Sequence, residues 1–229
     1  MKLLILGGGV FLGAHLLNAA LARGHAVTVF NRGRARSTWP AGVEAMRDAC
    51  ACCLLVSRVS ANADTTEPMT AEDRPLPSFE GIARDDRDMR HYGAQKAACE
   101  AEVMRVFGAR ALIVRPGLID GPGDRSGRFG HWVWRAAEGG TMLVPDVPAD
   151  KLMQHGVQPW SELPLWLPSI APEYAGFNRD LTRAAASGLR TRALQETIAT
   201  VLEEGIPPAD DKRRAGKLTR ERETALLDA

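Results

Sequence analysis

Uninterrupted apolar runs along the chain predict a series of short buried strands. Residues 2–6 and 111–114 contain no polar residue after Lys2, and residues 25–30 and 53–56 form two further runs. Such runs are typical of parallel strands that are covered on both faces. We therefore expect a largely parallel sheet.

Between these runs, apolar side chains recur at intervals of three and four residues, which predicts amphipathic helices. The pattern covers residues 12–23 and residues 91–106, each lying between two predicted strands. It returns in residues 128–139, 179–187 and 192–204. Strands that alternate with helices in this way predict an α/β fold.

Residues 43–46 resemble a third strand, but their position raises a difficulty. Residues 47–52 alone would connect them to the next run, at 53–56. A parallel crossover needs about a dozen or more residues, usually a helix. Either one of the two runs is not a strand, or the connection is unusual. Residues 61–88 are polar and predict a long loop, and residues 141–144 predict a short strand.

The first predicted strand ends in a glycine turn that leads into a helix. Strand, glycine turn and helix form the context in which a glycine motif indicates dinucleotide binding. Gly7 permits the tight turn, Gly9 keeps side chains away from a pyrophosphate, and Gly13 lets the helix pack close to the strand. The helix N-terminus offers free N–H groups to phosphates. The alternative is an ordinary tight connection.

The end of the second predicted strand suggests which dinucleotide would bind. An acidic residue there would bind the ribose 2′-hydroxyl of NAD. This chain has Asn31 followed by Arg32 and Arg34, which suit a 2′-phosphate and favour NADP over NAD. Solvated arginines in a loop are the alternative interpretation.

Composition narrows the class of protein. The 229 residues are 45% hydrophobic and 25% charged, as in a soluble globular protein, and the net charge is +1. This charge gives no reason to expect nucleic acid or an anionic membrane as a partner. No apolar run is long enough to span a bilayer, and the N-terminus does not resemble a signal peptide. We expect a cytoplasmic protein with a small-molecule substrate.

No metal site or disulfide is expected. The clustered cysteines lack the spacing of a zinc site, and we expect them to be small, buried apolar residues instead. The scattered histidines show no ligand spacing either. The residues concerned are Cys50, Cys52, Cys53, Cys99, His91, His131 and His155.

The sharpest candidate chemistry is Tyr92 followed four residues later by Lys96. On a helix this spacing places the two side chains on one face. An ammonium beside a phenol favours the phenolate and lowers the pKa of the phenol, so the pair suits acid–base chemistry on a carbonyl or an alcohol. Hydride would move to or from a nicotinamide. An unremarkable surface pair is the alternative.

Four segments in this order resemble the extended short-chain dehydrogenase/reductase family, the NAD-dependent epimerase/dehydratase group. They are the glycine turn through Gly13, the strand end at Asn31, Tyr92 with Lys96, and Arg115-Pro-Gly through Gly-Pro-Gly-Asp124. The resemblance implies a Rossmann-like, doubly wound parallel sheet, reduced in strand number, with a small C-terminal substrate lobe. It divides the chain into residues 1–127 and 128–204. Residues 205–229 mix proline with charged residues, and this composition predicts a flexible tail.

The resemblance also implies a Ser–Tyr–Lys catalytic set. Tyr92 would be the acid or base, Lys96 would bind the nicotinamide ribose and lower the pKa of Tyr92, and Ser60, or less well Ser57, would orient the substrate oxygen. Arg58 occupies the position of the family's second serine. The implied cofactor-binding positions are Gly7, Gly9, Phe11, Leu12, Gly13, Asn31, Arg32, Lys96 and Pro116.

The chain is shorter than the family pattern. The helix–strand–helix expected between Arg47 and Cys53 is missing, and so is a segment between about Asp150 and Trp160. Losing a central strand would force the remaining strands to pair differently or to find another partner, such as a second copy in a homodimer.

Two functions follow from these observations. The first is an NAD(P)-dependent oxidoreductase or epimerase acting on a carbonyl or secondary alcohol, for example of a sugar-like substrate. The second is a catalytically silent NAD(P)-binding sensor or scaffold, because of Arg58 and the missing segments. In the C-terminal part, Trp132 and Trp134 either line a substrate pocket or pack the lobe.

Overall fold

The computed structural model describes residues 1–6, 11–30, 43–62, 78–83, 86–142, 147–168, 179–214 and 216–228. The chain divides into two compact units. The first unit is Met1–Leu118 with Gly176–Asp180, and the second is Ile119–Ala175 with Leu181–Ala229.

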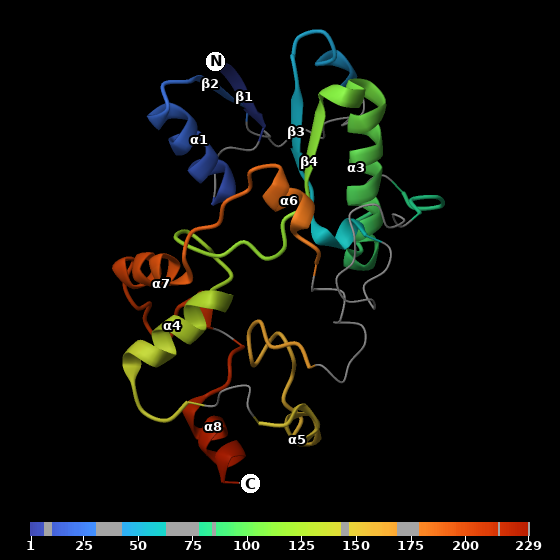
Figure 1. Ribbon diagram of the computed structural model, residues 1–229. Helices are drawn as coiled ribbons and strands as arrows, with labels where there is room; N and C mark the ends of the chain where they lie inside the picture. Colours follow the sequence, from blue (N-terminus) through green and yellow to red (C-terminus); the bar gives the residue numbers. More distant parts are fainter. Residues whose placement is uncertain are drawn as a thin grey trace. The chain divides into compact units, whose positions relative to one another are not determined.

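The first unit begins with a strand–helix–strand segment (Figure 1). Strand β1 (Lys2–Leu6) lies parallel to β2 (Ala26–Phe30), with Lys2 opposite Ala26 and Leu6 opposite Phe30. Helix α1 (Leu12–Ala22) connects them and packs against β2. This confirms the two predicted strands and the helix between them.

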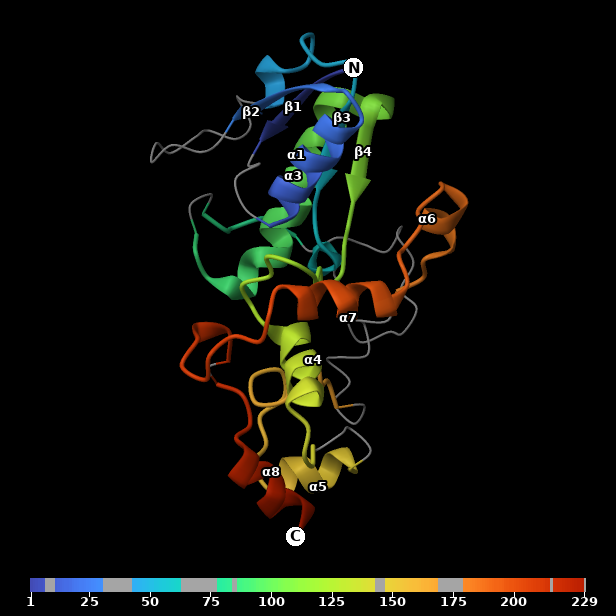
Figure 2. The ribbon, with the colours of Figure 1, turned by 90° about the vertical axis from the view of Figure 1, so that its left-hand side faces the viewer.

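A second segment of the same kind follows in the first unit. Strand β3 (Cys53–Val56) lies parallel to β4 (Ala111–Val114), and helix α3 (Tyr92–Phe107) packs against both strands. In Figures 1 and 2 α3 runs alongside the two strands. The pairing continues beyond the strands, since Ser57 N donates to Val114 O at 2.7 Å. These elements were also predicted from the apolar pattern.

The core of the first unit lies between α3 and the β3–β4 sheet. Val103, Val106 and Phe107 are buried on the C-terminal half of α3, and Leu55 packs against them. Full burial of one such side chain stabilises the fold by about 1.5–3 kcal/mol. This cluster fixes α3 on the sheet.

Residues 43–46 were predicted as a strand, and this is wrong. Residues 43–45 are helical, with Met46 N donating to Val43 O at 3.2 Å. Val43 is 1% exposed because it inserts into the α3 cluster, and Glu44 pairs with Arg105 of α3 at 2.9 Å. The crossover difficulty disappears, because the first of the two runs is not a strand.

The described strands form two separate two-stranded parallel sheets, β1–β2 and β3–β4, in a mixed α/β unit. No continuous sheet joins the two pairs within the described residues, so the full doubly wound sheet is not seen. The strands were predicted to be covered on both faces, and this is wrong for the described residues. One face of each strand pair carries exposed apolar side chains, since alternate strand residues are exposed. The exposed strand residues include Leu4 (46%), Phe30 (63%), Leu54 (56%) and Leu112 (57%).

The second unit is helical in its described part. Its helices are α4 (Arg128–Glu138), α5 (Ala149–Gln154), α6 (Thr182–Ala186), α7 (Leu194–Glu203) and α8 (Arg220–Leu227). Helices α4 and α7 pack together, and Figures 1 and 2 both show α5 beside α8. Short 3-10 turns occur in the first unit at Val59–Ala61 (η1), Met89–His91 (η2) and Gly108–Arg110 (η3), and in the second unit at Lys212–Arg214 (η5).

Residues 205–229, predicted as a flexible tail, instead contain packed structure. Leu218 and Leu226 are buried in a cluster with Leu163 and Trp166. Glu223 of α8 is 1% exposed and pairs with buried Arg135 of α4. The polar sequence of this segment concealed these contacts. Of the predicted strand at 141–144, residues 143 and 144 lie outside the described part, and 141–142 are not strand.

Candidate functional site

The candidate site residues of α3 form a single stripe at helical spacing. Tyr92, Lys96 and Glu100 follow one another at intervals of four, and Val103 and Phe107 continue the same face. The C-terminal end of the stripe is buried and apolar, whereas Tyr92 and Lys96 at its N-terminal end are half-buried. The predicted Tyr–Lys pair therefore lies where the stripe emerges from the core.

The Tyr92 ring is flanked by two cations. Lys96 Nζ and the guanidinium carbon of Arg58 each lie 5.7 Å from the ring centroid. Arg58 has extended backbone and precedes η1, which packs against α3. A cation this close to an aromatic face contributes about 0.5–1 kcal/mol. The geometry thus brings together Tyr92, Lys96 and a residue that sequence reasoning treated only as a departure from the family pattern.

A buried ion pair holds the elements around Tyr92 in place. Arg115, directly after β4, donates from Nη2 to Glu100 Oε2 at 2.6 Å and from Nε to both carboxylate oxygens at 3.0 and 3.1 Å. Its Nη1 donates to Asn62 Oδ1 at 3.3 Å. The side chain of Glu100 is 2% exposed. Arg115 therefore connects β4, α3 and the end of η1.

The two candidate serines lie near this cluster; Ser57 is buried, and Ser60 is half-buried. Ser60 lies in η1 and Ser57 directly follows β3, and the hydroxyl oxygens of both are inaccessible to solvent. Neither hydroxyl has a hydrogen-bond partner in the described part of the chain. A buried hydroxyl without a partner costs about 1–3 kcal/mol. Ser60 is thus close in the fold to α3, but it makes no hydrogen bond to Tyr92.

Pro116, a predicted cofactor-binding residue, lies beside the same turn. Its carbonyl oxygen accepts from Val59 N at 3.2 Å, which extends the β3–β4 pairing to the start of η1. The predicted residues Ser60, Tyr92, Lys96 and Pro116 consequently belong to one β3–α3–β4 segment.

The predicted phosphate-binding turn is only partly described. Gly7, Gly9, Asn31 and Arg32 lie outside the described residues. Phe11, Leu12 and Gly13 form the start of α1, where Phe11 is the N-cap with φ +39° and ψ −115°. A residue other than glycine in this left-handed range indicates local strain of about 1–3 kcal/mol. The first turn of α1 carries no acidic residue that would repel a phosphate.

The cysteines show no metal or disulfide chemistry. All four are free thiols, and within the described residues no cluster of His, Cys, Asp and Glu could hold a metal ion. Cys50 and Cys53 pack against the α3 cluster as predicted, whereas Cys52 is exposed, contrary to that prediction. Burial raises the pKa of Cys53 and of Cys99 and so favours the neutral thiol.

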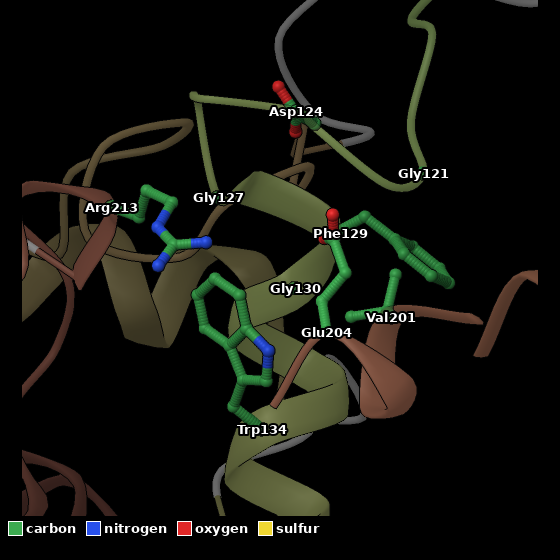
Figure 3. Close-up of a pocket in the computed structure, with 9 residues that line it drawn as sticks. All are labelled: Gly121, Asp124, Gly127, Phe129, Gly130, Trp134, Val201, Glu204 and Arg213. Atoms are coloured by element: carbon green, nitrogen blue, oxygen red, sulfur yellow. The ribbon is translucent and has the colours of Figure 1, made fainter. Parts of the chain in front are cut away.

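The second unit contains a small hollow at the start of α4 (Figure 3). Its charged side chains serve the fold: Glu204 accepts from Gly123 N at 2.9 Å, Asp124 accepts from Ser126 N at 2.8 Å, and Arg213 pairs with Asp211 at 2.9 Å. The hollow is lined by Gly121, Asp124, Gly127, Phe129, Gly130, Trp134, Val201, Glu204 and Arg213.

The two neighbouring tryptophans have packing contacts in this unit. Trp134 is 4% exposed, lies in the α4–α7 cluster and stacks under Arg213, whose guanidinium carbon is 5.6 Å from the ring. Trp132 donates from Nε1 to Pro164 O at 2.7 Å. Both tryptophans therefore have packing contacts in this unit, and Trp134 also lines the hollow. No helix in the described residues has the length and apolar character needed to cross a membrane.

Comparisons with protein-family models, with curated proteins and with solved structures find no match to this chain. Any functional assignment therefore depends on the residues and their geometry.

Proposed function

We propose that this protein is an NAD(P)-dependent oxidoreductase or epimerase that acts on a carbonyl or a secondary alcohol, with NADP preferred. The observation that carries the proposal is the arrangement of Tyr92 and Lys96. They lie one turn apart at the start of α3, and Arg58 approaches the same phenol ring. A phenol that lies between two basic side chains is a candidate proton donor or acceptor for the proposed reaction.

The proposed fold is a doubly wound Rossmann-like arrangement that has lost a central strand. Two strand–helix–strand segments with parallel strands support it, since such folds are built from units of this kind. The missing strand would lie between them, which accounts for two separate strand pairs. A small-molecule substrate and a homodimer remain part of this proposal.

The described residues suit a dinucleotide. The first turn of α1 has no carboxylate and no side-chain cap, so its N–H groups are available to phosphate oxygens. Gly7, Gly9, Phe11, Leu12 and Gly13 would hold the pyrophosphate. Lys96 would bind the nicotinamide ribose, with Pro116 beside it, and Asn31 and Arg32 would receive the adenine ribose. The nicotinamide, when bound, supplies or accepts the hydride.

The chain's own residues would handle the proton. The Tyr92 hydroxyl would donate to the carbonyl oxygen during reduction, or accept from the alcohol during oxidation. Lys96 and Arg58 would stabilise the charge left on the phenol oxygen. Arg115 and Glu100 would hold α3 and η1 in register, so that Tyr92 keeps its position.

A silent dinucleotide-binding sensor or scaffold is the second candidate. Burial of the Ser60 hydroxyl favours it, because an inaccessible hydroxyl does not orient a substrate oxygen. Arg58 at the other serine position favours it as well.

Cofactor binding is tested by thermal unfolding with NADPH, NADP, NADH or no ligand. Binding at a hundred times Kd stabilises the folded state by about 2.7 kcal/mol, so we expect a clear rise in Tm, larger for NADPH than for NADH. A larger rise with NADH would contradict the role given to Asn31 and Arg32. No rise with any cofactor would contradict both candidate functions.

Catalysis is tested by following NADPH oxidation with a panel of aldehydes and ketones. Tyr92→Phe keeps the ring and its cation contacts but removes the proton, so turnover should fall at least a hundredfold while NADPH still raises Tm. Tyr174→Phe, which changes the chain's other tyrosine, is the matched control and should keep its activity. Equal turnover in the two variants would refute the role of Tyr92, and cofactor binding without any turnover would favour the silent sensor.

A further inference from the structure

The cluster around Tyr92 carries an excess of positive charge. Arg58 and Lys96 both approach the Tyr92 ring to 5.7 Å from its centroid. Neither cation has a carboxylate partner among the described residues. Both side chains are half-buried rather than extended into solvent, so their mutual repulsion is screened less than at an open surface.

Three carboxylates on α3 or on the segment that leads into it already have basic partners. Each of them has its own basic partner, and each pairing is direct. These pairs are Asp86 with His91 at 2.6 Å, Asp88 with Arg90 at 2.5 Å, and Glu100 with Arg115 at 2.6 Å. They leave no described acidic side chain to neutralise Arg58 and Lys96.

The type of cation indicates what would neutralise it. An arginine presents several N–H donors in a planar fork that matches the oxygens of a carboxylate or a phosphate. A serine, which the resembled family carries at the position of Arg58, presents one hydroxyl and suits a neutral oxygen. Arg58 thus places a group suited to binding an anion next to the proposed proton donor.

We infer that the substrate carries an anionic group, a carboxylate or a phosphate, close to its reacting carbonyl or alcohol, and that Arg58 binds this group. The inference rests on the proposed function of Tyr92. It narrows the substrate class from any carbonyl compound to oxo acids and phosphorylated aldehydes or ketones. Lys96 remains with the phenol and the ribose.

The test is isothermal titration calorimetry with matched probes in the presence of saturating NADPH, in a buffer free of phosphate. One pair is 2-oxobutyrate and 2-oxobutanamide; the other is glyceraldehyde 3-phosphate and glyceraldehyde. We expect at least one anionic probe to bind tenfold or more tightly than its uncharged partner, and the two pairs distinguish carboxylate from phosphate.

Three variants assign the effect to Arg58. Arg58→Gln should weaken binding of the anionic probe at least tenfold and leave the uncharged probe unchanged. Arg58→Lys keeps the charge but loses the planar fork, so it should bind the anionic probe more weakly than the unchanged protein and more tightly than Arg58→Gln. This intermediate affinity keeps the test valid if the glutamine variant does not fold. Arg23→Gln removes one positive charge from an exposed arginine that donates to Ala19 O, and should change binding less than twofold.

The outcomes separate this inference from the proposed function. Equal binding of charged and uncharged probes, or an anion preference unaffected by Arg58→Gln, overturns the inference even if NADPH binds and turnover depends on Tyr92. Conversely, an anion preference that depends on Arg58, together with cofactor binding, supports the inference. An anion preference without any cofactor binding overturns both the inference and the proposed function.

Discussion

Replacing Arg115 with methionine should destabilise the protein more than replacing its partner. The substitution leaves the Glu100 carboxylate, 2% exposed, without its cation. It removes contacts at 2.6, 3.0 and 3.1 Å. Breaking a buried pair from one side costs about 3–5 kcal/mol, which is a large fraction of a typical total stability of about 5–15 kcal/mol.

The reverse substitution, Glu100→Met, should cost less, about 1–3 kcal/mol. The Arg115 side chain is 20% exposed, so its guanidinium can turn toward water, whereas the Glu100 carboxylate cannot. The double variant with methionine at both positions leaves no unpaired charge, and we expect it to be more stable than Arg115→Met alone.

Stability is measured by urea unfolding followed by circular dichroism, with hydrogen exchange of α3 amides as a local readout. Additive losses, with the double variant equal to the sum of the two single variants, would refute the pairing. Equal losses from the two single variants would refute the argument from exposure.

Three further predictions concern packing and titration. Burial, with nearby cations, lowers the pKa of His131 from 6.5 to about 4, so on acidification the unfolded chain binds a proton at a higher pH than the folded protein does. The free energy of unfolding should therefore fall by about 3 kcal/mol between pH 6.5 and 4. The His131→Gln variant should lack this pH dependence in urea unfolding followed by tryptophan fluorescence. Gly127→Ala places a Cβ 2.5 Å from Arg213 O at φ +61° and should destabilise the protein by about 3 kcal/mol. The control Gly156→Ala, at φ +70° with open space around it, should destabilise it by about 1 kcal/mol. Equal midpoints of thermal unfolding for the two variants would contradict the steric overlap with Arg213. Val103→Ala leaves a cavity at a fully buried position and should lower the free energy of unfolding by about 2 kcal/mol. A decrease below about 0.5 kcal/mol in urea unfolding would contradict the place of Val103 in the core.

The sequence predicts the elements whose signal is local. Runs such as residues 111–114 are rich in β-branched and other apolar residues, so their strand character is visible without the rest of the chain. That alternate residues such as Leu112 are exposed was not visible in the same way. The shared face of Tyr92 and Lys96 follows from the helical period alone. Both were therefore predictable.

Elements decided by distant contacts were not predictable. The sequence Val-Glu-Ala-Met at residues 43–46 fits a strand or a helical turn equally well. The contact of Val43 with the α3 cluster and the pairing of Glu44 with Arg105 decide the outcome. Similarly, the sequence of α8 is polar and predicts a tail, whereas the buried pairing of Glu223 with Arg135 fixes it as a packed helix. The position of Arg58 over Tyr92 depends on η1 packing against α3, which no spacing in the sequence encodes.

The division of the strands into two pairs has a consequence for function. The proposed phosphate-binding turn, ending at Gly13, belongs to the β1–α1–β2 segment, whereas Arg58, Tyr92 and Lys96 all belong to β3–α3–β4 and its adjoining turn. The residues that would move a proton are thus positioned by contacts within their own segment, chiefly the Arg115 ion pair. The Arg115 ion pair involves neither β1 nor β2, so it would be unaffected by the strand loss that we propose between the segments. Acid–base chemistry and dinucleotide affinity should therefore respond to different substitutions: changes at the Arg115 pair should lower turnover, and changes at Gly13 should lower cofactor affinity.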